Sequence, residues 1–525
     1  MEYSLSSSLI GGSGSLNPDK LSLDLQFATT KSLTAVKGPT PTFVRASTGT
    51  FVDYNGILKT GVDAAAINVA RFDHETSYVG SEITIACANC FDGNGGAVKS
   101  SDTVLFSGLD ANGYPLFIGS YFNVSYDTGS SYWVLSGASG DFEATRTQDI
   151  GGAYTIANGT GTSVQVDLFL ACKGLLIEEG RSNQIKYSYN NFTNAYWDST
   201  ASNVTAVDSV AFGPNGISFG ASSLTEIVDV SVSRHIHELA GVFTPVANSS
   251  YTMSAWVKQS ESNPIRYVQL AFWIAGFGST AYMNFDIQAG VVGTGGAGIT
   301  NSSITAYPNK WYRITATATS VASPAASGFQ LGFSTTSSAV RAEAYTVVAP
   351  TKSIYLWGAQ VELGAFPTSY IPTIASVPIT RSADLCSITG SAFTSFYNQP
   401  AGTVIANIYS CNGIQPRFNS FGPSRTLELL KFNGIAYHNG TNETNITFTA
   451  TFPCKVGVTC TLNDSIGVFN GVLGGSRTSL IMPSPTYMNI GCYLDNALQL
   501  NGCISSIKFY KKRLTNAKLQ SLTAP

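Results

Sequence analysis

Apolar and polar residues alternate with a period of two along much of this chain. Residues 21–27 (LSLDLQF), 251–257 (YTMSAWV) and 311–317 (WYRITAT) all show the pattern. Neighbouring side chains on a strand point to opposite faces of a sheet, so this alternation predicts half-buried β-strands. Segments with helical periodicity are almost absent. The sequence therefore predicts an all-β, multi-domain fold made of antiparallel β-sandwiches.

One alternating strand carries a tryptophan. A strict period of two places Tyr355, Trp357, Ala359, Val361 and Leu363 on a single face. We therefore expect this face to point inward and Trp357 to be buried in the core of a central sandwich.

Residues 77–171 contain short strand patterns separated by turn signals such as Asp92-Gly93 and Asn158-Gly159. Strands are predicted at 103–106, 115–118, 132–135 and 164–168. We expect a small β module inserted in a loop, where binding function often concentrates.

The two ends of the chain differ from its middle. Residues 1–40 begin with Ser- and Gly-rich sequence, which suits an N-terminal arm that docks on assembly, and include the strand at 21–27. A short linker at 374–383 leads to a last unit at 376–525, which ends in a strand and one short helix capped by Thr515. The predicted segments are thus an arm (1–40), a lead-in (41–76), the inserted module (77–171), a sandwich (172–375) and the last unit.

Composition limits the classes of molecule that the protein is expected to bind. A chain of 525 residues suits about three to four domains. Only 12% of the residues are charged, while hydroxyl and amide side chains, which match the hydrogen bonding of sugars, are abundant. The net charge of −3 gives no electrostatic case for binding nucleic acid.

The sequence also bears on the compartment. Its nine cysteines are odd in number and scattered, which does not suit a disulfide framework. The start, Met1-Glu2-Tyr3-Ser4, lacks the features of a signal peptide, and no apolar stretch approaches the length of a membrane span. We expect assembly in a reducing cytoplasm, no membrane insertion, and release by lysis.

Three parts of the chain carry a resemblance to a known family. They are residues 174–183 (GLLIEEGRSN), residues 355–373 (YLWGAQVELGAFPTSYIPT) and an upstream pair, 43–53 (FVRASTGTFVD) and 68–73 (NVARFD). Together they resemble a signature of tailed-bacteriophage virion proteins. In that family the GLLIEE strand opens a β-sandwich, the YLWGAQ strand closes it, and the upstream pair is the lead-in.

The resemblance implies a jelly roll similar to carbohydrate-binding modules at residues 172–375. The ending at 504–519 resembles concanavalin/laminin-G-type jelly rolls, which implies a second jelly roll at 376–525. The signature residues for which it implies a structural role are Glu178, Glu179, Arg181, Trp357, Glu362 and Tyr370.

For function, the resemblance implies a virion protein of tail-fibre or appendage type that binds host-surface glycans. Its partners would be other virion proteins and two further copies of itself, as a homotrimer. One alternative is a head fibre or capsid decoration protein with a purely structural role. Another is a polysaccharide-degrading tailspike, which should show the regular repeats of a parallel β-helix, and the sequence shows no such period.

The adjacent carboxylates Glu178 and Glu179 are the first candidates for catalysis. Neighbours on a strand point to opposite faces, so the two cannot flank one scissile bond as glycosidase carboxylates do. We expect one of them to pair with Arg181 or Arg71. The sequence predicts no catalytic residue and no cofactor.

Two other motifs have metal-ligand character. His235 and His237 would lie on one strand face, but a zinc site needs a third ligand that nothing nearby supplies. Cys87 and Cys90 form a single CxxC without a second pair. We therefore expect no metal site.

Glycan recognition requires exposed aromatic rings beside amides and hydroxyls. Tyr437, His438 and Asn439 form such a mixture in a predicted turn of the last unit. They are the sequence-based candidates for a glycan-binding site, and an ordinary hairpin tip is the alternative.

Overall fold

The computed structural model describes the chain in full at residues 20–76, 170–197, 203–398, 400–412, 451–477, 484–493 and 498–525, apart from the side chains of Ala240 and Arg477. Outside these ranges it describes the backbone alone of strands β6 to β11 and β30 to β33.

The chain divides into two compact units. One is continuous and spans residues 43–384, and the other joins residues 1–42 to 385–525. We call the first the inserted unit and the second the flanking unit. The inserted unit is larger than the predicted inserted module at 77–171 and contains it. The predicted strand at 21–27 is present as β1 (Leu21–Leu25), but it pairs with β38 (Gly502–Tyr510). The described N-terminal residues are thus part of the unit that holds the C-terminus, which differs from the predicted division into a separate arm and a last unit beginning at 376.

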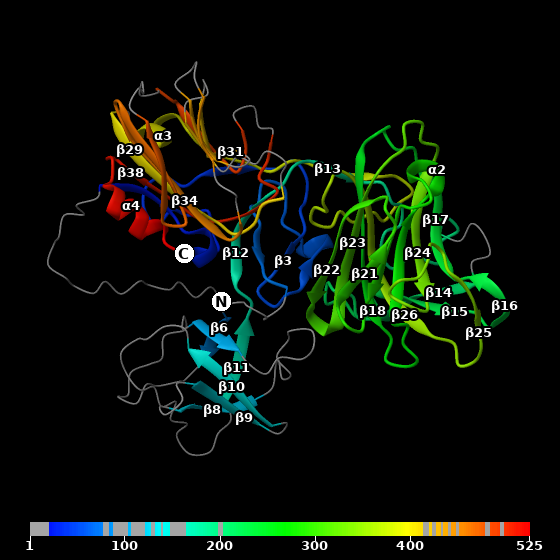
Figure 1. Cartoon of the computed structure of the whole chain (residues 1–525). Coiled ribbons are helices and arrows are strands. Elements are labelled where there is room, and N and C mark those ends of the chain that lie inside the picture. Colours follow the sequence, from blue (N-terminus) through cyan, green and yellow to red (C-terminus); the bar gives the residue numbers. More distant parts are fainter. Residues whose placement is uncertain are drawn as a thin grey trace. The chain divides into compact units, whose positions relative to one another are not determined.

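The inserted unit contains a sandwich of two antiparallel sheets, drawn in green in Figure 1. The first has the strand order β14-β15-β26-β18-β23-β22 and the second β17-β24-β19-β20-β21. Apolar residues that alternate along both sheets, such as Met253 and Leu270, pack into one buried core. The strands predicted at 251–257 and 311–317 are confirmed as β18 and β23.

The first sheet consists of β14 (Val204–Ala211), β15 (Ala221–Glu226), β18 (Ser250–Gln259), β22 (Ile299–Tyr307), β23 (Trp311–Thr319) and β26 (Ser353–Leu363). The second consists of β17 (Ile236–Phe243), β19 (Tyr267–Phe272), β20 (Tyr282–Asp286), β21 (Val291–Gly295) and β24 (Ser327–Ser334). A two-stranded ribbon, β16 (Asp229–Arg234) with β25 (Ala344–Val347), and the short helices α2 (Ile274–Phe277) and η2 (Pro308–Lys310) complete this region.

Strand β26 changes faces halfway along its length. Gly358 has a φ of 66°, and the register with β18 shifts at this point, which defines a β-bulge. Ala359 and Val361 therefore point into the sandwich core, whereas Trp357 points to the other side of the sheet. Trp357 is fully buried, but it lies outside the sandwich core. The predicted single face and the predicted position in the sandwich core were wrong, because one extra residue breaks the period of two.

The GLLIEE segment lies in neither sheet of the sandwich. Its strand, β12 (Cys172–Ile177), pairs with β5 (Phe72–His74) of the lead-in, and β13 (Arg181–Asn183) pairs with β27 (Ile379–Arg381). The expectation that this strand opens the sandwich was therefore wrong. The lead-in also holds β2 (Thr42–Val44), the hairpin of β3 (Phe51–Val52) with β4 (Leu58–Lys59), and the short helix η1 (Gly61–Asp63).

The described strands of the predicted inserted module form a closed barrel. Its strand order is β10-β7-β6-β11-β8-β9, with antiparallel pairs throughout. The strands expected at 103–106, 132–135 and 164–168 are confirmed, while 115–118 lies outside the described residues. The barrel strands are β6 (Ile83–Cys87), β7 (Thr103–Phe106), β8 (Tyr121–Asp127), β9 (Tyr132–Gly137), β10 (Gly140–Arg146) and β11 (Val164–Phe169).

The flanking unit is also built from antiparallel sheets. One has the order β36-β35-β34-β29-β38, with β1 on β38, and the other the order β28-β37-β30-β31-β32-β33. Helix α4 (Asn516–Thr523) packs Leu519 against Ile405 and Val468. The hydroxyl of Thr515 accepts the Lys518 N–H at 3.3 Å, so the predicted N-cap is confirmed. The all-β prediction holds for both units.

The strands of this unit are β28 (Leu385–Thr389), β29 (Ala401–Ile408), β30 (Asn419–Gly422), β31 (Leu427–Lys431), β32 (Gly434–His438), β33 (Glu443–Thr447), β34 (Cys454–Thr461), β35 (Asp464–Phe469), β36 (Val472–Arg477) and β37 (Tyr487–Ile490). Two further short helices are α1 (Phe27–Thr30) and α3 (Gly390–Phe396).

Candidate functional site

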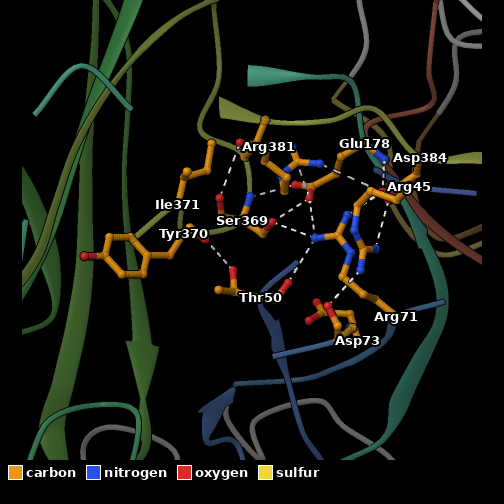
Figure 2. Close-up of polar contacts among 12 residues, drawn as sticks. Arg45, Thr50, Arg71, Asp73, Glu178, Ser369, Tyr370, Ile371, Arg381 and Asp384 are labelled. Carbon is orange, nitrogen blue, oxygen red and sulfur yellow. Dashed lines mark hydrogen bonds and ion pairs between the residues drawn. The ribbon is translucent and has the colours of Figure 1, made fainter. Parts of the chain in front are cut away.

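Five charged side chains from distant segments meet inside the inserted unit (Figure 2). Each is no more than 7% exposed. Two come from the lead-in, one follows β12, and two come from β27 and the residues after it. We call this set the ion network, and its members are Arg45, Arg71, Glu178, Arg381 and Asp384.

Arg71 is the centre of the ion network. Its Nη1 lies 2.8 Å from Glu178 Oε2, and its Nη2 contacts Asp384. Nη1 also donates to the main-chain oxygen of Thr50 at 2.9 Å and to the hydroxyl of Ser369 at 2.7 Å. One guanidinium thus joins the lead-in to residues that follow β12, β26 and β27.

Asp384 has arginine contacts on both oxygens. Its Oδ1 lies 3.2 Å from Arg45 Nη1, and its Oδ2 lies 4.0 Å from Arg381 Nη1. The Glu178 N–H donates to the Asp384 carboxylate, and the Asp384 N–H donates to the Glu178 carbonyl, both at 2.9 Å. The two carboxylate residues are therefore tied by main chain as well as by shared arginines.

Glu178 is held in its charged form. Its carboxylate accepts the N–H and the hydroxyl of Ser369 at 2.7 and 2.6 Å, and Arg381 Nη2 lies 3.5 Å away. Burial alone would raise the pKa of Glu178. The charges of Arg381 and Arg71 and the Ser369 hydrogen bonds outweigh it and lower the pKa to about 2.

Three guanidinium groups face only two carboxylates in the ion network. Main-chain carbonyls share the excess charge: Arg45 donates to Ser47, Ala65 and Ala66, and Arg381 donates to Glu179. Burial, followed by the charge of Arg71, lowers the pKa of Arg45. Burial disfavours the charge of Arg71 as well, but Asp384 and Glu178 outweigh it and raise its pKa.

Other signature residues also make internal contacts. Arg181 pairs with Glu179, donates to the Leu363 carbonyl, and lies over the Phe366 ring with Cζ 4.9 Å from its centroid. Gly364 makes this possible, since a Cβ there would fall 1.8 Å from Arg181 Nη1. The signature arginine thus requires the signature glycine.

Two buried polar residues fix the chain after β26. Glu362 accepts the N–H and the hydroxyl of Thr368. Asn183 donates to the carbonyls of Ala359 and Ile371 at 3.2 and 2.9 Å. The FPTSYIPT segment is therefore held to β13 and β26 along its length.

Trp357 and Tyr370 belong to an aromatic cluster on the side of the sheet opposite the sandwich core. Their ring centroids are 4.6 Å apart, and Trp256 meets the two rings edge-on at 5.4 and 5.5 Å. Burial raises the pKa of Tyr370 well above its ordinary value. The two ends of the long YLWGAQ motif thus pack directly on each other.

The acidic pair acts by binding arginines. Glu178 lies in the ion network and Glu179 pairs with Arg181, so the structure forms both of the pairings that the sequence offered as alternatives. Their contacts join the chain segments of the inserted unit.

The two candidate metal histidines are packed in the protein interior. His235 lies with its ring nitrogens 3.2 Å from the carbonyls of Asn203 and Tyr345, and His237 stacks on Trp197 at 5.4 Å. Within the described residues no three His, Cys, Asp or Glu side chains gather as metal ligands would. Of the CxxC pair, Cys87 lies in β6 and Cys90 lies outside the described residues.

The sequence-based glycan candidates lie in the flanking unit. Tyr437 and His438 are the last two residues of β32 and pair with Thr444 and Glu443 of β33, whereas Asn439 lies outside the described residues. The hairpin is as expected, but the two residues are at the end of a strand and not in the turn.

Sequence reasoning missed Ser369, Arg381 and Asp384 as partners of Glu178, and Arg45 as a partner of Asp384. Arg381 and Asp384 lie in or next to the predicted linker, which the structure shows to contain β27. A usable signal was present, because charged residues are rare in this chain and these lie among apolar or small neighbours.

Comparisons with known proteins name no family. No family model and no curated protein matches the chain. Among solved structures, the chain is similar to the N-terminal CBM22-1-CBM22-2 tandem domain of Xyn10C from Paenibacillus barcinonensis. The identity is 10% and the TM-score 0.21, over 65% of this chain and 99% of that one. A TM-score of this size carries no argument about function. In the described part of the chain, no helix has the length and apolar character needed to cross a membrane.

Proposed function

We propose that this protein is a component of a tailed-bacteriophage virion, of tail-fibre or appendage type, and that it binds glycans on the host surface. The observation that carries the proposal is the meeting of the family motifs in space. Arg45 and Arg71 of the lead-in, Glu178 of GLLIEE and Ser369 of FPTSYIPT all contribute to the ion network or bind it directly. The residues behind the resemblance therefore depend on one another, and this mutual dependence supports the proposal.

A binding role suits this architecture better than catalysis. The acidic pair, which is the strongest catalytic candidate in the sequence, is engaged by arginines. The ladders within both sheets of the sandwich are antiparallel, whereas a tailspike enzyme is expected to contain a parallel β-helix. An interior fixed by buried charge and aromatic packing provides a rigid scaffold for surface recognition.

Glycan binding is supported by composition. The chain is rich in hydroxyl and amide groups, and only 12% of its residues are charged. Tyr437 and His438, at the end of β32, remain candidates for contact, as does the barrel of strands β6 to β11. Partners in the assembly would be other virion proteins and further copies of the chain.

Immunogold electron microscopy tests the proposal. Antibodies against the purified chain should label the tail fibres or tail tip of phage particles whose genome encodes it. Labelling of the capsid would favour the decoration alternative and exclude the appendage role. Purified particles without the chain would exclude a virion protein altogether. In parallel, the fluorescently labelled chain should bind host cells, and should lose binding after the surface glycans are removed by periodate oxidation.

A further inference from the structure

A half-buried tyrosine that packs against the sandwich core lies beside an exposed tyrosine, in the segment between β13 and β14. The ring centroids of Tyr187 and Tyr196 are 5.6 Å apart, and their planes differ by 32°. The Tyr196 side chain is 44% exposed. The Lys186 ammonium lies 4.8 Å from the centroid of the Tyr196 ring. We call these three residues the tyrosine platform.

The chain beneath the tyrosine platform is firmly anchored. Trp197 is fully buried, meets Phe192 edge-on at 4.7 Å, and donates its indole N–H to the Tyr187 carbonyl at 3.0 Å. The Asn194 side chain accepts the Tyr196 N–H at 3.1 Å. The two rings are therefore held in place by neighbours that are themselves fixed, as a binding surface requires.

The backbone of Tyr187 is in an unfavourable conformation for its residue type. Its φ of 49° lies in the left-handed region, which Gly or Asn adopts more readily than a bulky side chain. The nearby Asn190, with a φ of 47°, follows the usual preference. Strain of this kind persists where the surroundings impose it, and it gathers at functional sites. Here it presents a ring beside Tyr196.

Lys186 adds a charge to this surface. Its ammonium contacts the Tyr196 ring, and in the described part of the chain it forms no ion pair with a carboxylate. An exposed aromatic ring with a cation next to it matches a sugar that carries a carboxylate. The ring stacks on the C–H face of the sugar, and the ammonium pairs with the acid.

We propose that the tyrosine platform binds an acidic polysaccharide, one built of uronic or sialic acids. The inference rests on the proposed glycan-binding function and names its site and ligand class. Lys186 also provides selectivity. A neutral sugar that stacks on the Tyr196 face must displace the cation without replacing its contact, whereas an acidic sugar replaces that contact with an ion pair.

Calorimetric titration of the full-length chain with four polymers tests this inference. Polygalacturonate, hyaluronate and polysialate are the acidic probes, and dextran is the neutral one. At least one acidic polymer should bind about tenfold or more tightly than dextran. Its affinity should fall as salt is raised, because an exposed ion pair is screened.

Three variants locate the site. Lys186→Met should remove the preference for the acidic polymer while leaving or improving the weak binding of dextran. Tyr196→Ala should abolish binding of both. Tyr54→Ala is the matched control, since Tyr54 is 43% exposed and lies outside the platform, and it should bind as the unmodified chain does. Unchanged melting curves would show that each variant is folded.

The outcomes separate this inference from the proposed function. If an acidic polymer binds but Lys186→Met and Tyr196→Ala bind it equally well, the site assignment is overturned while glycan binding stands. If none of the acidic polymers binds more tightly than dextran, the ligand class is overturned. If the chain binds host cells in a periodate-sensitive way with either result, the proposed function survives the loss of this inference.

Discussion

Arg71 joins more segments of the inserted unit than a surface arginine can, because it is fully buried between Glu178 and Asp384. Removing it would take the nearest guanidinium from each of two buried carboxylates. We expect Arg71→Ala to lower the free energy of unfolding by about 3–5 kcal/mol. Urea unfolding followed by tryptophan fluorescence measures this change.

Arg266→Ala is the matched control. Arg266 also pairs with an aspartate, Asp286, but its side chain is 47% exposed. Its loss should lower the free energy of unfolding far less than the loss of Arg71, because solvent screens an exposed ion pair. Equal effects of the two substitutions would contradict a stabilising role for the ion network.

The low pKa of Glu178 predicts acid sensitivity. The group has an ordinary pKa of 4.5 and a folded-state pKa of about 2, so its stabilising contribution is complete above pH 4.5. That contribution, about 3 kcal/mol, is lost as the pH falls from 4.5 to 2. Urea unfolding between pH 6 and pH 2 should show this decline. Glu178→Gln should be less stable at neutral pH and should have a flatter profile in this range, and an unchanged slope would contradict the assignment.

At the scale of secondary-structure elements, the bulge in β26 decides which side chains meet. Gly358 combines a φ of 66° with a position where a Cβ would lie 2.7 Å from Trp256 Cε3. We expect Gly358→Ala to destabilise the protein by about 2–4 kcal/mol, from backbone strain and from the clash with the ring. The melting temperature and the near-ultraviolet circular dichroism of the tryptophans report the change.

Gly61 separates the two causes. It has a φ of 59°, but a Cβ added there would meet nothing within 4 Å. Gly61→Ala should therefore cost about 1 kcal/mol from strain alone. A Gly358→Ala protein as stable as Gly61→Ala would show that the bulge tolerates a side chain.

The same elements show where sequence reasoning succeeded and where it failed. Strands such as β18 and β23 were predictable because their alternation is local and unbroken. The face of Trp357 was not predictable. One extra residue at Gly358 reverses the alternation of faces, and the surrounding sequence does not mark the bulge. The ion network was not predictable either, since Arg45 and Asp384 lie 339 residues apart and a single sequence does not encode which charges meet.

At the scale of the whole molecule, the fibre interpretation predicts that copies of the chain associate with one another. The first sheet of the sandwich ends in the edge strands β14 and β22. Edge strands of this kind can pair with a strand of a further copy. We expect a homotrimer, as is common for fibre proteins. Light scattering on the purified chain should return three times the chain mass of 55.4 kDa. A stable monomer at micromolar concentration would count against the fibre interpretation.

The pairing of Arg45 with Asp384 has an evolutionary consequence. These residues lie beside the two points where the chain enters and leaves the inserted unit, Thr42/Phe43 and Asp384/Leu385. The two ends of the unit are therefore joined by an ion pair between its own side chains. Recombination at these two points would carry both partners of the pair together. A lineage that exchanged the whole segment would inherit the pair intact, whereas an exchange that ended inside the unit would leave a buried charge without its partner.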